Sequence, residues 1–229
     1  RRTIDIENTA KNFDSRTIDK NVGVTYFPNI TIEDGTNKKL LTVPASIAAL
    51  SAISYTDKVS FPWWAVAGLN RASLDFVKGA QVRINNKTDR ETLYSARINP
   101  IIKLPRESFV IWSQQTLALG DSLFTNLNIK RMVLEIKRII VAIATRLVFE
   151  NITTDLYQNF TSQTNSVLSV VQTREGVESF KVICDETNNS DEDRNNNKMN
   201  GVIMVQPTKA FEYIELSFAV YPSGVVFSD

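Results

Sequence analysis

Histidine is absent from this chain of 229 residues, and its absence limits the chemistry that the chain can perform. Histidine is the most common general base in enzymes and the most common protein ligand of transition metals. Without it, neither a Ser-His-Asp nor a Cys-His nucleophile system can form. The single cysteine, Cys184, excludes an internal disulfide, which is typical of a reducing compartment.

Glycine is scarce, and long apolar segments are missing. The 8 glycines form neither of the strings, GxxxxGK[ST] and GxGxxG, that hold phosphate groups. The longest apolar stretch, 139–144, is far shorter than the roughly 20 residues that a membrane-spanning helix needs. A net charge of +1 gives no reason to expect nucleic acid or an anionic membrane as a partner. No signal peptide opens the chain, and because the first residue is not methionine we expect a processed chain or a piece of a longer protein.

The patterns that are present predict an α/β fold. Segments with helical spacing alternate with β-branched segments, which predicts a central mixed sheet flanked by helices. The expected helices cover residues 4–14, 43–57, 88–98, 127–149 and 154–172. The expected strands cover residues 79–84, 99–105, 108–118, 178–185, 201–207 and 209–220. Residues 22–32 form two short strands or one kinked edge strand, 33–39 form a turn, and 60–72 form a loop.

Two local signals refine these elements. Thr88 is the expected N-cap of helix 88–98, and Glu91 three residues later completes a capping box. Trp63 and Trp64 are adjacent in the loop 60–72. We interpret the pair as packing this loop against the core, with stacking on a ligand as the alternative.

Helix 127–149 has the clearest periodicity in the chain. Its apolar face is formed by Ile129, Met132, Val133, Ile136, Ile139, Ile140, Ile143 and Leu147. Its opposite face is basic and includes Lys130, Arg131, Lys137 and Arg138. Such a face is either solvated or bound to an acidic partner, and spacing alone leaves both alternatives open.

The stretch 185–200 is rich in Asp, Glu and Asn. Asp191, Asp193 and Asn195 match the first three ligands of an EF-hand loop, but the expected glycine and the final glutamate are missing and the flanks are strands. We therefore interpret the stretch as a solvated loop that joins two antiparallel strands. Cys184 shares the parity of Phe180 and Val182, which indicates a buried, inert thiol.

The order of several segments resembles the C-terminal conserved region of the tail sheath proteins of contractile phage tails and related injection machines. The likeness begins with TYFPNITIEDGTNKKLLTVPASIAALSAISYTD and continues with SFPWWAVAGLNR and LYSARINPIIKLPRESFVIWSQQTL. It includes a long helix that ends in F-E, the pattern V-x-C-D-x-x-N-N and a final P-T-x-x-x-E-x-I-x-L-x-F. The tip after Asn189 and the tail YPSGVVFSD depart from the family pattern.

The resemblance implies that residues 1–229 are one sheath core domain whose N-terminal arm and outer domains are missing, with 178–229 as a C-terminal β hairpin and arm. It implies a structural subunit that polymerises around a tail tube and contracts to drive the tube through a host envelope. The implied partners are other copies of the chain, the tube protein, and baseplate and terminator proteins, in a virion tail assembled in the host cytoplasm. No enzymatic activity, cofactor, metal, nucleic acid or membrane insertion is expected.

The resemblance also implies which residues make contacts. The C-terminal strands form the joint between subunits, with candidates Phe211, Tyr213, Leu216, Phe218, Val225, Val226 and Phe227. The tube-facing candidates are Lys130, Arg131, Lys137 and Arg138, and helix 154–172 is the alternative inward element. Without the N-terminal arm, the chain is expected to be monomeric in dilute solution.

Two alternatives remain open. The sheath of a bacterial injection system or a bacteriocin would share these features. A carboxylate-based hydrolase using Asp185 and Glu186 needs no histidine, although neighbouring residues on a strand point to opposite faces.

Overall fold

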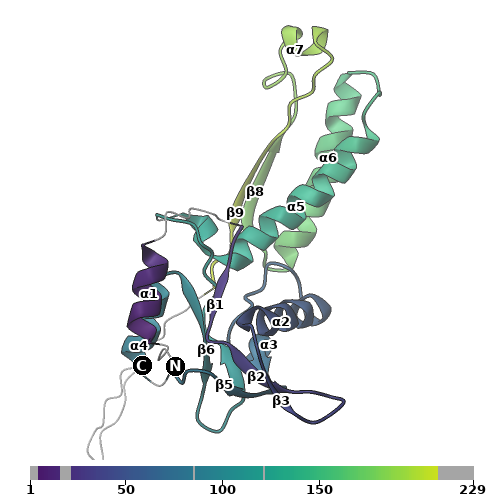
Figure 1. The fold of residues 1–229 in the computed structure, drawn as a ribbon. Coiled ribbons are helices and arrows are strands. Elements are labelled where there is room, and N and C mark those ends of the chain that lie inside the picture. Colours follow the sequence, from purple (N-terminus) through teal and green to yellow (C-terminus); the bar gives the residue numbers. More distant parts are fainter. Residues whose placement is uncertain (1–4, 16–21, 85, 121, 211–229) are drawn as a thin grey trace, which may run out of the picture.

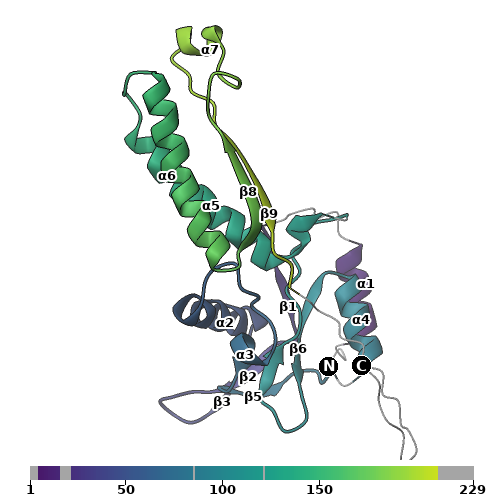
Figure 2. The same cartoon turned by 180° about the vertical axis from the view of Figure 1, so that it is seen from behind.

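The computed structural model describes residues 5–15, 22–84, 86–120 and 122–210, and it divides into a body and an arm. The body contains the elements from α1 to β7. The arm consists of two long helices and a two-stranded hairpin, which lie side by side and project from the body in both views (Figures 1 and 2).

The body is built from short elements. Its helices are α1 (Ile6–Asp14), α2 (Ala45–Val59), α3 (Leu69–Ala72) and α4 (Lys87–Ser95). Its strands are β1 (Thr25–Phe27), β2 (Ile30–Glu33), β3 (Leu40–Val43), β4 (Ser73–Leu74), β5 (Val77–Ala80), β6 (Ile98–Lys103) and β7 (Phe109–Ile111).

These strands form two sheets. The four-stranded sheet has the order β1-β6-β7-β4; β1 runs parallel to β6, and the other neighbours are antiparallel. The three-stranded sheet has the antiparallel order β3-β2-β5. The four-stranded sheet is mixed, as the sequence predicts, and β6 is buried from Ile98 to Ile102, with the polar Asn99 among its buried residues.

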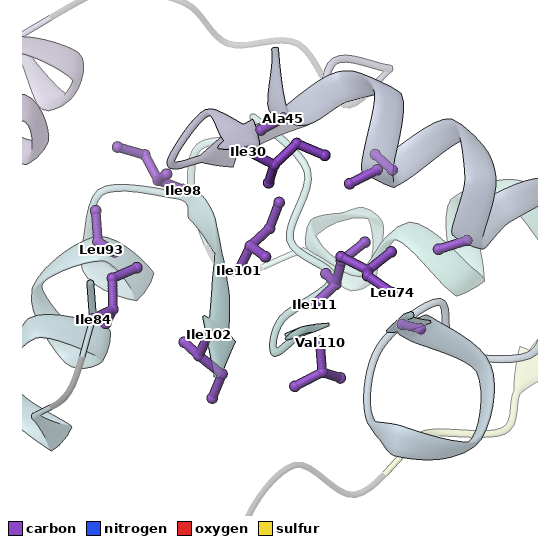
Figure 3. Packing of buried hydrophobic residues seen from close by; sticks show 14 of the residues in the cluster. Ile30, Ala45, Leu74, Ile84, Leu93, Ile98, Ile101, Ile102, Val110 and Ile111 are labelled. Carbon is purple, nitrogen blue, oxygen red and sulfur yellow. The ribbon is translucent and has the colours of Figure 1, made fainter. Parts of the chain in front are cut away.

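Small residues let α2 lie close to the sheets. Ala45, Ala48, Ala49 and Ala52 are buried at helical spacing on α2. They pack in one core with branched side chains from the strands, many of which are labelled in Figure 3. This core holds the body together.

Several predicted boundaries differ from the structure. Residues 22–32 form two short strands that belong to different sheets, which was one of the two alternatives. The predicted capping box of α4 is wrong, because the helix begins at Lys87 and its N-cap is Asn86, two residues before Thr88. The strand predicted at 79–84 lies at Val77–Ala80, and the loop predicted at 60–72 contains the short helix α3.

The strand predicted at 108–118 ends at Ile111, and Gln115 beyond it forms an isolated antiparallel bridge with Asn126 instead of extending β7. The buried Asn99 side chain on β6 donates to the Gln115 carbonyl at 2.8 Å and accepts from the Gln115 N–H at 2.6 Å. The Asn99 side chain therefore pairs with both main-chain groups of Gln115, while the main chain of Gln114 and Thr116 bonds to Leu127 and Thr125.

The arm begins with two antiparallel helices. These are α5 (Leu127–Arg146) and α6 (Thr154–Thr173), followed by β8 (Val177–Ile183), α7 (Asp191–Asn195) and β9 (Val202–Pro207). The predicted apolar face of α5 is confirmed where it is buried, at Ile129, Met132, Ile136, Ile140 and Ile143. In the described residues no helix has the length and apolar character needed to cross a membrane.

Trp63 joins the arm to the body. Its indole Nε1–H donates to the Arg174 carbonyl at the end of α6 at 2.8 Å, and its carbonyl accepts from the Asn128 side chain on α5 at 3.3 Å. The ring also packs against the arm's apolar core. The predicted packing role of the tryptophan loop is therefore confirmed for Trp63, while Trp64 lies 4.8 Å beneath the Arg71 guanidinium.

Candidate functional site

The β8–β9 hairpin is a sheet of only two strands. The strands are antiparallel, with Phe180 opposite Val205 and Val182 opposite Ile203. Within the described ranges, neither strand pairs with any other strand, so both outer edges carry main-chain N–H and C=O groups without a ladder partner. An isolated two-stranded hairpin is marginal by itself, and open edges accept further strands.

One face of the hairpin is covered and the other is open. Phe180, Val182, Ile203 and Val205 pack into the apolar core that the hairpin shares with α5 and α6. On the opposite face Met204 is 52% exposed. Gly201 allows β9 to start close to α6, because a Cβ there would lie 2.9 Å from Cε1 of Phe160.

Two asparagines close the hairpin below its tip. The Asn188 side chain donates to the Ile183 and Asn200 carbonyls at 3.2 and 2.9 Å. The buried Asn189 side chain donates to the Asp185 and Asn200 carbonyls, at 2.9 and 3.0 Å, and accepts from the Asn200 N–H at 2.5 Å. The N-N of the pattern V-x-C-D-x-x-N-N therefore continues the strand pairing through side chains where the main chain can no longer do so.

The acidic tip contains a short helix where the sequence predicts only a loop. Ser190 caps α7: its Oγ accepts from the Asp193 N–H at 3.2 Å, and the Asp193 carboxylate accepts from the Ser190 N–H at 3.1 Å. Hydrogen bonds from Ser190 lower the pKa of Asp193 to about 2. Asp193 is thus engaged in a capping box, whose sequence signature, Ser190 followed by an acid three residues later, is readable within the acidic run.

The acidic residues at the base of the tip are also held locally. The Asp185 carboxylate accepts from the Thr187 N–H at 2.8 Å, and hydrogen bonds from Thr187 lower its pKa. Glu186 accepts from the Thr154 hydroxyl at 3.4 Å. Both acids lie beyond the end of β8, which ends at Ile183, so the strand predicted at 178–185 is two residues shorter at this end.

Cys184 is buried, as predicted, and burial raises the pKa of its thiol. The neighbouring Asp185 carboxylate adds to this shift. A raised thiol pKa keeps the group protonated and weakly nucleophilic at neutral pH.

The four basic residues proposed from the sequence for α5 do not share one environment. Arg131 forms an ion pair with Asp57 of α2, and its side chain is only 15% exposed. The Lys130 ammonium lies 5.0 Å from the centre of the Phe124 ring. Lys137 and Arg138 are exposed, and Arg138 donates to Glu135 on its own helix at 3.0 Å.

The strand predicted at 209–220 and the tail after it fall mostly outside the described residues. This applies to every intersubunit candidate: Phe211, Tyr213, Leu216, Phe218, Val225, Val226 and Phe227. The described chain runs through Thr208, whose N–H donates to the Gly176 carbonyl at 3.2 Å, to Ala210.

Comparison with known sequences gives related proteins for most of the chain. Residues 120–220 match the family described as phage tail sheath C-terminal domain. A tail sheath protein of Vibrio phage KVP40 is 30% identical over 196 residues, which are 86% of this chain and 29% of that protein. A tail sheath protein of Enterobacteria phage T4 is 27% identical over 185 residues, 81% of this chain and 28% of that protein. The chain thus spans less than a third of the length of either relative.

Solved structures share the fold at lower identity. The sheath complex of an extracellular contractile injection system, PVC, in its contracted state, has a TM-score of 0.81 at 15% identity, over 95% of this chain and 61% of that chain. The contracted helical sheath of the anti-feeding prophage has a TM-score of 0.75 at 20% identity, over 86% of this chain and 55% of that chain. These likenesses show the fold of the body and the arm.

Proposed function

We propose that the complete protein is a structural subunit of a contractile sheath. The proposal proceeds from the premise that this chain carries the C-terminal conserved region of the contractile tail sheath proteins. Its copies polymerise into a helical sheath around a tail tube, and contraction drives the tube through a host envelope. The sheath belongs to a virion tail assembled in the host cytoplasm, with baseplate and terminator proteins at its ends. Sequence relatives from phages support a phage tail over the alternative of a bacterial injection system or a bacteriocin.

The observation that carries the proposal is the β8–β9 hairpin. Its two edges have no ladder partner in the part of the chain that the structure describes, and one of its faces is already anchored on the helices of the arm. Strands lent by neighbouring subunits would pair with these edges through main-chain hydrogen bonds. Such a joint stays connected while whole subunits rotate relative to each other, which is what contraction requires.

The chain's own C-terminal residues are the proposed donor. The described chain leaves β9 at Pro207, and the candidates Phe211, Tyr213, Leu216 and Phe218 follow within eleven residues. The alternation of apolar and polar residues in this segment is typical of a strand with one buried face. Val225, Val226 and Phe227 then offer a second short apolar strand.

Truncation of the full-length protein after Tyr221 tests this assignment. The body and arm are expected to fold normally, because every described element lies before the cut. Polymerisation is expected to weaken or to be lost, because the donor loses Val225, Val226 and Phe227. Negative-stain microscopy compares the tubes formed by the truncated and intact proteins, and normal tubes from the truncated protein would exclude residues 222–229 as the donor. A full-length variant with Ser at these three positions keeps the main chain of the tail and removes only its apolar side chains. It therefore distinguishes the effect of losing the side chains from the effect of shortening the chain.

The contact with the tube is proposed for the exposed basic residues of α5. Lys137 and Arg138 face solvent, whereas Arg131 is already paired with Asp57 of the body. An acidic tube surface would meet these two residues through weak, salt-sensitive contacts that contraction can break.

The hydrolase alternative uses the pair Asp185 and Glu186. Both residues lie at the base of the hairpin tip, where each carboxylate accepts a hydrogen bond from a threonine.

A further inference from the structure

The turn between α5 and α6 presents an aromatic side chain that the folded chain does not use. Phe149 is 102% exposed, so its ring lies entirely in solvent. Its backbone is left-handed, with φ at 72°, a conformation that is uncommon for a bulky residue. Val148 beside it is 57% exposed. A residue that gains nothing from burial and has a disfavoured backbone points to a role outside its own chain.

The surroundings of Phe149 carry more negative than positive charge, with Arg146 at the end of α5 as the nearby basic residue. The turn and the first residues of α6, 147–155, contain Glu150 and Asp155 and no basic residue. Glu186 from the base of the hairpin tip contacts this region through Thr154. We call residues Val148, Phe149 and Glu150 the knob.

A groove of about 840 Å³ lies at the other end of the same helix pair. Its aromatic and apolar lining includes Trp64, Leu69, Tyr94 and Trp112. Leu69 is 43% and Trp112 42% exposed, so the groove opens to solvent at these side chains. Its size suits one or two large apolar side chains.

The groove carries more positive than negative charge. Arg71, Lys87, Arg90 and Lys209 line it, against Glu91 and Glu175. Arg71 lies over the Trp64 ring, and Lys87 is 3.5 Å from Glu91. The knob and the groove are therefore complementary in two respects. The knob has an apolar ring and an acidic residue, and the groove has an aromatic lining and more basic than acidic residues.

The knob cannot reach the groove of its own chain. Asn128, the second residue of α5, lines the groove, and the knob follows the last residue of α5, Arg146. At about 1.5 Å per residue, a helix of 20 residues separates them by about 30 Å. Figure 1 shows the turn between α5 and α6 at the far end of the arm, away from the body.

We propose that the knob of one copy inserts into the groove of a second copy of this chain, with Phe149 between Trp64 and Trp112. Because the two surfaces differ and lie at opposite ends of the arm, the contact is heterologous and propagates from copy to copy. It uses side chains rather than shared strands, so it does not depend on the hairpin joint proposed above. A contact of this small area is weak in solution and becomes effective where many copies are aligned.

Sedimentation of the 229-residue chain at high concentration and low salt tests the contact. The weight-average mass of the wild-type chain is expected to rise with concentration. Phe149→Ser is expected to lower the association constant at least about tenfold, because the buried ring supplies most of the contact. Val170→Ser, which also removes an exposed apolar group from the arm, is the matched control and should leave the association constant unchanged.

Complementary variants test the direction of the contact. Leu69→Asp blocks the groove, and it is expected to weaken association as Phe149→Ser does, with circular dichroism confirming that both variants fold. A one-to-one mixture of the two has one intact knob and one intact groove, so it is expected to form dimers that do not grow further. A mixture that associates no better than either variant alone overturns the proposal. If the groove holds residues 211–229 of its own chain, Leu69→Asp leaves self-association unchanged, which also overturns it.

A photo-cross-linking aromatic at position 149 identifies the surface that the knob touches. With p-benzoylphenylalanine in place of Phe149, mass spectrometry is expected to find cross-links to peptides that contain residues 63–71, 87–94 or 112–114. Cross-links confined to other peptides would contradict the assignment of the groove.

Discussion

At the scale of single residues, the junction between body and arm depends on close contacts around Trp63. Gly176 follows α6, and a Cβ at this position would lie 2.6 Å from Cγ1 of Val171 and 3.1 Å from two ring atoms of Trp63. Val171 is buried, and the Trp63 ring is fixed by its hydrogen bond to the Arg174 carbonyl. Neither neighbour can move without disturbing the junction.

Gly176→Ala is therefore expected to lower the free energy of unfolding by about 1–3 kcal/mol, the usual cost of adding a methyl group to a packed site. Gly35→Ala is the control, since a Cβ there meets nothing within 4 Å. Urea denaturation of the two variants and the parent chain measures the difference. Equal stabilities for the two variants would contradict the tight packing described for the junction.

At the scale of elements, the sequence predicts α5 well and the strand at 108–118 poorly. The buried face of α5 follows from its periodicity, because apolar residues at helical spacing lie on one face of the helix and that face packs against the core. The end of β7 does not follow, because the main chain of Gln115 bonds to the side chain of Asn99, sixteen residues earlier, and bridges to Asn126. The start of α4 at Lys87 is equally hidden, since its N-cap residue, Asn86, makes no side-chain capping hydrogen bond. Local patterns predict local structure, and long-range side-chain bonds override them.

The candidate site divides in the same way. The hairpin strands follow from apolar alternation, whereas the helix α7 is missed, although Ser190 followed by Asp193 is a signature of its capping box. The ion pair of Arg131 with Asp57 joins residues 74 positions apart, so no local pattern reveals that Arg131 is engaged. The solvent position of Phe149 is likewise hidden, because the predicted helix 127–149 includes Phe149 whereas α5 ends at Arg146.

The tip helix α7 is expected to be sensitive to acid. The pKa of Asp193 is about 2 in the folded chain and therefore below its unfolded value, so its carboxylate stabilises the tip above about pH 4. This stabilisation is expected to fall as the pH drops from about 4 through about 2. Hydrogen exchange of the α7 amides checks it. Asp193→Asn is expected to flatten the pH dependence in this window, and Asp191→Asn, the same charge change on the same turn, should retain it.

The exposed basic pair of α5 gives a second prediction at this scale. Reversal of both charges, Lys137→Glu with Arg138→Glu, is expected to impair assembly of the full-length protein on tail tubes without unfolding it, because both side chains lie in solvent. A pelleting assay with isolated tubes at several salt concentrations measures this. Reversal of two exposed basic residues of the body, Lys11 and Arg83, is the control. Unchanged binding by the α5 variant would indicate that another element, such as α6, faces the tube.

At the scale of the whole molecule, the structure consists of a body with its own core and an arm that carries the hairpin. The body has a continuous core beneath α2, whereas the arm carries a hairpin with two open edges in its described part and an exposed aromatic at its far end. A lattice that shortens needs both properties, because its units must keep their shape while their mutual orientation changes. In this account the hairpin joint holds neighbours together, and the knob and groove form a separate contact.

The central claim is that β8 and β9 gain strands from neighbouring subunits. A cryo-EM reconstruction of the tubular polymer formed by the full-length protein tests it most directly. The account predicts at least one further strand, from a different subunit, hydrogen-bonded along an outer edge of β8 or β9. A polymer in which the hairpin remains two-stranded would contradict it.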